Sequence, residues 1–143
     1  MTRRKQILVV EDDADVRLGY QVLLNANHYD TVFAGDSSSA VSEALKHLPN
    51  LTILDLGIPA GDGFKVLERF RANLKLMYMP VIVVSGRDLS DNKHRALAAG
   101  AKAYLQKPWN DHELLSTIRL FLGETDSSFG GLGNASPRAP IEL

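Results

Sequence analysis

Short apolar runs and longer amphipathic stretches alternate along this chain. Three runs are continuously apolar and rich in β-branched residues, at 7–10 (ILVV), 51–54 (LTIL) and 81–84 (VIVV). Continuous apolarity is typical of parallel strands that are covered on both faces, because a half-exposed strand alternates apolar and polar residues. Weaker runs at 30–34 (DTVFA) and 101–105 (AKAYL) predict two further strands.

Helical patterns fill the segments between these runs. Apolar residues recur at helical spacing at Val16, Tyr20, Leu23 and Leu24, and later helices are predicted at 40–48, 64–70, 92–99 and 114–122. Each predicted helix is preceded by a residue that favours a helix start: Asp13, Asp36 or Ser37, Asp62, Ser90 or Asp91, and Asn110 or Asp111. Three helices are followed by a residue that favours a helix end: Asn27, Gly100 and Gly123. Five β-α units predict an α/β fold, an open parallel sheet that is doubly wound, with helices on both faces.

The length and composition predict one ordered domain and a tail. The chain has 143 residues, of which 45% are hydrophobic and 23% charged, enough for a sizeable core. Residues 1–123 are assigned to the domain. Residues 124–143 show no periodicity and are interpreted as a flexible tail or the start of a linker, with breakers at Gly130, Gly131, Gly133, Pro137 and Pro140.

Charge and residue usage exclude several classes of function. The net charge is −1, from 16 basic and 17 acidic residues, so no direct nucleic-acid binding by this segment and no membrane binding are expected. The absence of cysteine excludes disulfides and thiolate metal sites, and the four histidines lack ligand spacing. The apolar run after the basic start is too short for a signal peptide or a membrane span, so we expect a cytoplasmic protein.

Polar residues follow the predicted strands at the point where each strand ends. Glu11 and Asp12 follow the first strand, Asp55 ends the third, Ser85 ends the fourth and Lys107 follows the fifth. In open α/β sheets, ligands bind at the carboxyl ends of the strands, where the strand order reverses. We therefore expect these side chains to converge, although 96 positions separate the first from the last.

The charges in this group indicate a chemistry. Two carboxylates about 4 Å apart repel by roughly 4 kcal/mol at an effective dielectric constant near 20, and one lysine cannot offset three of them. A divalent cation can, and a set of oxygen ligands favours Mg²⁺ or Mn²⁺. A cation, Lys107 and the Ser85 hydroxyl are the components of a phosphoryl-transfer site, with Asp55 as the nucleophile that forms an aspartyl phosphate.

Four segments carry a resemblance to a known family. In this order and spacing, ILVVEDD, LTILDLGIPAGDGF, VIVVSG and AYLQKPW resemble the signatures of the response-regulator receiver domain of two-component systems, over about residues 5–122. The resemblance implies a flavodoxin-like sheet of five parallel strands in the order 2-1-3-4-5, with five helices. It also implies a Mg²⁺ ion, or Mn²⁺, held by Glu11, Asp12, Asp55 and the backbone carbonyl of Gly57.

The resemblance also implies roles for further residues. Ser85 is similar to the switch hydroxyl, Lys107 to the phosphate-binding lysine before a cis proline, and Tyr104 to the aromatic switch residue. Asp13 lies one place beyond the acidic pair and is expected to cap a helix. Two positions depart from the family pattern: Trp109 stands where phenylalanine is usual, and Gly86-Arg87 follows the serine, where Arg87 is expected to alter the rate of dephosphorylation.

The implied function is a signalling switch. A sensor histidine kinase or phosphotransfer protein in a phosphorelay would donate a phosphoryl group to Asp55, and the face formed by helix 4, strand 5 and helix 5 would change conformation. The domain would catalyse only its own phosphorylation and dephosphorylation. The resemblance allows a homodimer through the same face, and the sequence leaves the output module unknown.

Other interpretations stay open from the residues alone. The acids at 11–13 could simply cap a helix and complement its dipole, Asp55 could be a turn residue, and Tyr104 could be a half-buried strand aromatic. A phosphatase with an aspartate nucleophile is disfavoured, because Leu56-Gly57 offers no second acid and no insertion is long enough for a cap. A degenerate receiver that acts only as a binding module is disfavoured by the complete acid set.

Overall fold

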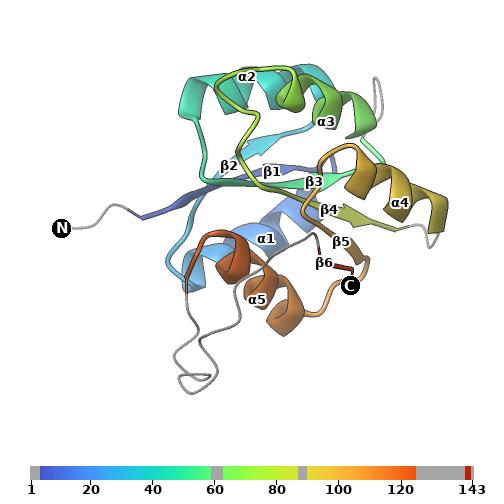
Figure 1. Cartoon of the computed structure of the whole chain (residues 1–143). Helices are drawn as coiled ribbons and strands as arrows, with labels where there is room; N and C mark the ends of the chain where they lie inside the picture. Colours follow the sequence, from blue (N-terminus) through green and yellow to red (C-terminus); the bar gives the residue numbers. More distant parts are fainter. Residues whose placement is uncertain (1–3, 59–62, 87–89, 125–140, 143) are drawn as a thin grey trace.

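The computed structural model describes residues 4–58, 63–86, 90–124 and 141–142 (Figure 1). Its strands are β1 (Gln6–Val10), β2 (Asp30–Ala34), β3 (Leu51–Asp55), β4 (Val81–Ser85), β5 (Ala103–Gln106) and β6 (Ile141–Glu142). Its helices are α1 (Ala14–Ala26), α2 (Ser37–His47), α3 (Gly63–Arg71), α4 (Ser90–Ala98) and α5 (Asp111–Phe121). No helix among these described ranges is long and apolar enough to cross a membrane.

The strands form one parallel sheet in the order β2-β1-β3-β4-β5-β6. The predicted order of the first five strands is confirmed. The short β6 was not predicted: Ile141 and Glu142 pair with Ala103 and Tyr104, along an edge of β5 that would otherwise leave backbone groups unpaired. Residues 125–140 lie outside the described part of the chain, so the flexible tail expected there stays a prediction.

Helices cover both faces of the sheet, as predicted (Figure 1). Helices α2, α3 and α4 pack on one face and α1 and α5 on the other. Successive strand residues point to opposite faces, so Leu8 and Val10 join the first layer while Ile7 and Val9 join the second. All four are fully or almost fully buried, which explains why the strand runs are continuously apolar.

Side-chain caps set where the helices begin. Asp13 Oδ1 accepts hydrogen bonds from the N–H groups of Asp15 and Val16, at 2.8 and 3.1 Å. Asp36 and Asn110 cap α2 and α5 in the same way, each by accepting from the backbone N–H three residues later. The predicted role of Asp13 as a helix cap is confirmed. Glu11 and Asp12 lie between the end of β1 and this cap.

Helix ends also agree with the sequence. Asn27 follows α1 as its C-terminal cap, and Gly100 and Gly123 adopt the left-handed φ angles of 112° and 71° that favour glycine. The predicted start of α3 at Asp62 lies outside the described residues, and α4 begins at Ser90.

The start of α3 lies against the end of β3. The Gly63 N–H donates to the Leu56 carbonyl at 3.3 Å, and a Cβ atom on Gly63 would lie 2.9 Å from Leu56 Cα and 3.0 Å from the Asp55 carbonyl oxygen. Both neighbours are backbone atoms and cannot rotate away. Glycine at this position therefore allows the start of α3 to pack closely against the backbone of Asp55 and Leu56.

Replacing Gly63 by alanine should destabilise the fold by about 1–3 kcal/mol, because the added methyl group forces the backbone of Leu56 to shift. The matched control is Gly19→Ala in α1, where no heavy atom lies within 4 Å of the new methyl group. That change should stabilise the protein by about 0.5–1 kcal/mol through helix propensity. Urea unfolding measures both, and a Gly63→Ala variant as stable as the original chain would contradict this packing.

Candidate functional site

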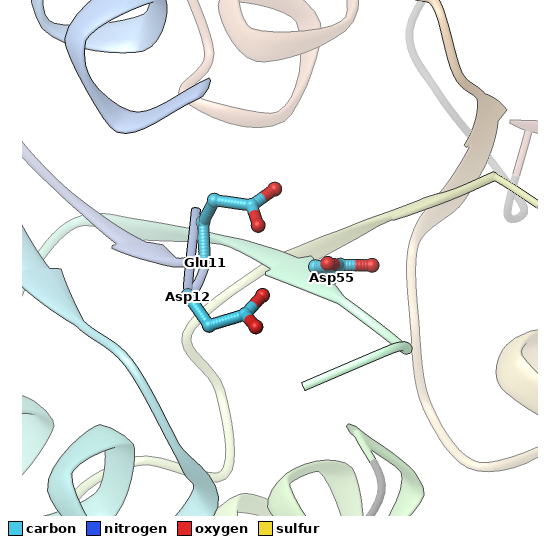
Figure 2. A group of neighbouring side chains, drawn as sticks. All are labelled: Glu11, Asp12 and Asp55. Carbon is cyan, nitrogen blue, oxygen red and sulfur yellow. The ribbon is translucent and has the colours of Figure 1, made fainter. Parts of the chain in front are cut away.

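Three carboxylates meet at the carboxyl edge of the sheet (Figure 2). Val10 pairs with Leu54 across the neighbouring strands β1 and β3, so the next residues, Glu11 and Asp55, continue side by side. One ligand oxygen from each of Glu11, Asp12 and Asp55 lies within 4.8 Å of the others. The register of two parallel strands thus produces the predicted convergence.

Glu11 is the most buried member of this acidic cluster. The residue is only 1% exposed, whereas Asp12 is exposed and Asp55 is intermediate. Its Oε1 atom accepts a hydrogen bond from Lys107 Nζ at 2.6 Å, and its Oε2 atom accepts one from the Asp13 N–H at 3.2 Å. Both oxygens are therefore satisfied, as a buried carboxylate requires.

Lys107 reaches the cluster from the loop after β5. Its ammonium group lies 3.4 Å from Asp55 Oδ2, farther than from Glu11, so it bridges two of the three acids. Its backbone N–H donates to the Ser85 carbonyl at 2.8 Å. Lys107 therefore links the carboxyl ends of β4 and β5 to those of β1 and β3.

The pKa shifts at this site reflect burial and the contact of Lys107 with two acids. Burial raises the pKa of Glu11 above its ordinary value of 4.5, and the nearby charge of Asp55 raises it further, although the hydrogen bond from Lys107 opposes both. Burial lowers the pKa of Lys107, but its hydrogen bond to Glu11 and the charges of Asp55 and Glu11 outweigh burial and leave that pKa raised. The Lys107 ammonium group is therefore held in its charged form, while burial keeps the pKa of Glu11 raised in spite of this contact.

The cluster fits a hard divalent cation. Its donors are carboxylate oxygens from two strand ends, the type that Mg²⁺ and Mn²⁺ prefer. Among the described residues it is the only such group of three or more, and the four histidines are exposed and do not belong to it. A bound cation would offset the repulsion among these three carboxylates.

The other predicted site residues are Gly57, in the turn after β3, and the buried residues Ser85 and Tyr104 of β4 and β5. Gly57 donates its N–H to Asp55 Oδ1 at 3.0 Å, so the turn after β3 folds back on the acid. Ser85 ends β4 and is buried, one residue beyond the Val84 that pairs with Asp55. Tyr104 is buried within β5 opposite Val83, in the layer covered by α2, α3 and α4.

Two further expectations concern the loops. The Lys107–Pro108 peptide is cis, as the resemblance implies. Arg87, expected to influence dephosphorylation, lies outside the described residues.

One aromatic contact at this edge is not predicted by any pattern in the sequence. The rings of Tyr20 in α1 and Trp109 stack with centroids 4.2 Å apart and an interplanar angle of 14°. In the sequence, Tyr20 is one apolar position on a predicted helix and Trp109 stands where the resembled family usually has phenylalanine, and neither pattern identifies a partner. They are 89 residues apart, and no sequence pattern links them.

A family model for the response regulator receiver domain matches residues 7–119. The chain belongs to this family. KdpE, a transcriptional regulatory protein of Mycobacterium tuberculosis, is 35% identical over 113 residues, which cover 79% of this chain and 49% of KdpE. PhoB, the phosphate regulon transcriptional regulatory protein of Escherichia coli, is 31% identical over 115 residues, covering 80% and 50%. This receiver chain spans about half the length of these curated relatives.

Solved structures agree with the receiver fold. A CheY-like receiver domain protein from Methanospirillum hungatei has a TM-score of 0.78 at 28% identity, covering 84% of this chain and 94% of that one. The receiver domain of the sensor histidine kinase PA1611 from Pseudomonas aeruginosa has a TM-score of 0.78 at 25% identity, covering 85% and 99%. That structure contains a magnesium ion coordinated in its active-site cleft. Family membership makes this chain a regulatory domain and disfavours the phosphatase alternative.

Replacing Glu11 by glutamine should stabilise the metal-free protein at neutral pH. Because the folded protein raises the pKa of Glu11, the ionised carboxylate costs stability at pH values above that raised pKa. The gain should shrink as the pH falls through the raised pKa, and vanish below 4.5, where the glutamate is protonated in both states.

Urea unfolding between pH 7 and pH 4 in the presence of a chelator measures this difference. The control is Glu68→Gln, since Glu68 is an exposed glutamate of α3 and its replacement should leave stability nearly unchanged. A Glu11→Gln variant that is less stable than the original chain at neutral pH would show that the bond to Lys107 outweighs burial and repulsion.

Proposed function

We propose that this receiver domain is a phosphorylation-dependent signalling switch whose phosphoryl acceptor is Asp55. A sensor histidine kinase or a phosphotransfer protein is the donor, in the cytoplasm. The observation that carries the proposal is the position of the Lys107 ammonium group, 2.6 Å from Glu11 and 3.4 Å from Asp55, beside a cluster of three carboxylates. Phosphoryl transfer requires a nucleophile, here a carboxylate, and positive charge beside it that stabilises the transferred group.

In the transfer step, an Asp55 carboxylate oxygen attacks the phosphorus atom of a phosphohistidine. The nitrogen–phosphorus bond breaks, an oxygen–phosphorus bond forms, and the donor imidazole leaves with the bonding electron pair. Lys107 lies close enough to Asp55 Oδ2 to pair with the negative oxygens of the incoming group. The Ser85 hydroxyl, at the adjacent strand end, is proposed to donate a hydrogen bond to one of those oxygens.

Glu11, Asp12, Asp55 and the Gly57 carbonyl would hold Mg²⁺, with Mn²⁺ as a substitute. The magnesium in the related PA1611 receiver supports this assignment, as does the oxygen-only donor set. When bound, the cation supplies positive charge that offsets the charge of the transferred group. The intact acid set favours this function over a receiver that acts only as a binding module.

Phosphorylation changes the charge balance that holds the strand ends together. An aspartyl phosphate adds negative charge and new acceptor oxygens beside Lys107. Since the Lys107 N–H binds the Ser85 carbonyl, movement of one loop is transmitted to the other. We propose that this movement shifts the conformational equilibrium of the α4–β5–α5 face, which includes Tyr104. In its shifted conformation, this face would bind an effector, an output module or a second copy of the chain.

Asp55→Asn should abolish phosphorylation by acetyl phosphate in the presence of Mg²⁺, because the amide is not a nucleophile for this transfer. Intact-protein mass spectrometry measures the gain of one phosphoryl group. The matched control is Asp13→Asn, which keeps a capping side chain at the start of α1 and should remain a substrate. Phosphorylation of Asp55→Asn at the rate of the original chain would overturn the assignment of the acceptor.

Asp12→Asn should weaken Mg²⁺ binding by roughly tenfold or more, because one charge–charge attraction at about 4 Å is worth several kcal/mol and each 1.4 kcal/mol is tenfold. Isothermal titration calorimetry measures the affinity, and the neighbouring Asp13→Asn variant should bind nearly as tightly as the original chain. Equal losses in the two variants would place the cation elsewhere.

A further inference from the structure

The stacked pair of Tyr20 and Trp109 lies beside Lys107, whose ammonium group contacts two members of the acidic cluster. Trp109 is the sole tryptophan of the chain and follows Lys107 by two positions. Its ring lies nearly parallel to that of Tyr20, at a centroid distance of 4.2 Å. Tyr20 is 1% exposed, so its partner rests on a ring that is fixed within the core.

The Trp109 ring is held on a second side as well. Its Nε1–H donates to Asp111 Oδ1 at 3.0 Å, at the start of α5. On the other side of the loop, the Lys107 N–H is held by the Ser85 carbonyl at 2.8 Å. The backbone that carries the lysine side chain is therefore anchored at the lysine itself and again two residues later.

Tyr20 connects this loop to the acids. It belongs to α1, which begins directly after the acidic pair at the end of β1. Burial raises the pKa of Tyr20, and the negative charges of Glu11 and Asp55 raise it further, so the phenol group lies within the field of the acids. The stack thus joins the helix that follows Glu11 to the loop that presents Lys107.

Small displacements of this loop change the contacts of the lysine. The two distances from Lys107 Nζ, 2.6 Å to Glu11 and 3.4 Å to Asp55, differ by less than one ångström. A shift of that size in the loop would break one contact or exchange the two. Misplacement on this scale has large effects on transfer rates.

We propose that the stack of Tyr20 and Trp109 positions Lys107 between Glu11 and Asp55 and thereby sets the rate of phosphoryl transfer at Asp55. Both aromatic residues are positioning residues, because they act through the lysine and do not touch the reacting atoms. The statement about rate rests on the proposed function, whereas the statement about position does not.

The positional part is tested by nuclear magnetic resonance of the lysine ammonium groups in the full chain. Lys107 Nζ–H protons bound to Glu11 should exchange slowly and give a resolved signal, assigned by its loss in Lys107→Arg. Trp109→Leu and Tyr20→Leu remove the stack and should abolish the signal. Trp109→Phe and Tyr20→Phe keep two stacked rings and should retain it.

The rate is tested by phosphorylation with acetyl phosphate and Mg²⁺. Trp109→Leu should slow the reaction by about tenfold, and Trp109→Phe should restore it to within about twofold. In a Lys107→Ala background, Trp109→Leu should have no further effect on the rate. Trp109→Leu should lower the stability in urea both with and without Lys107.

The outcomes separate this inference from the proposed function. A retained ammonium signal in Trp109→Leu, or an equal slowing in the presence and absence of Lys107, would mean that the stack serves packing alone and would overturn the inference. Loss of the signal in both leucine variants, in a protein that acetyl phosphate does not modify at Asp55, would uphold the positioning of Lys107 and overturn the proposed function.

Discussion

The hydrogen bond between Lys107 Nζ and Glu11 Oε1 is the interaction on which the carboxyl edge of the sheet depends. It is 2.6 Å long and joins residues 96 positions apart. Among the described side chains of this site, three carboxylates and one ammonium group leave two negative charges when all are ionised. Burial, with a smaller contribution from the charge of Asp55, keeps the pKa of Glu11 raised in spite of the bond from Lys107. Such a site is stabilised by a bound cation, and under the proposed function Lys107 divides its hydrogen bonds between Glu11 and the phosphoryl group on Asp55.

Much of this arrangement could be predicted from sequence, because its causes are local or topological. Strands buried on both faces produce continuous apolar runs, and capping side chains such as Asp13 and Asn110 mark helix starts through bonds to nearby backbone groups. Parallel β-α units place all strand ends at one edge, so Glu11, Asp55 and Lys107 had to converge there once the strands were identified.

The remaining features depend on contacts that no local pattern encodes. The choice of Glu11 as the nearer partner of Lys107 follows from side-chain packing at less than ångström scale. The stack of Tyr20 and Trp109 joins two segments whose separate patterns indicate only a helix face and a loop. Strand β6 spans two residues and relies on the free edge of β5, not on a periodicity of its own.

The most direct test is a crystal structure of the complex with Mn²⁺ and beryllofluoride, a mimic of the phosphorylated form. We expect an anomalous manganese peak in contact with Asp12 and Asp55, beryllium bonded to an Asp55 oxygen, and Lys107 Nζ bound to a fluorine atom instead of to Glu11 alone. Manganese outside the acidic cluster, or a Lys107 that keeps its bond to Glu11 and leaves the beryllofluoride group uncontacted, would contradict the central role given to this charge imbalance.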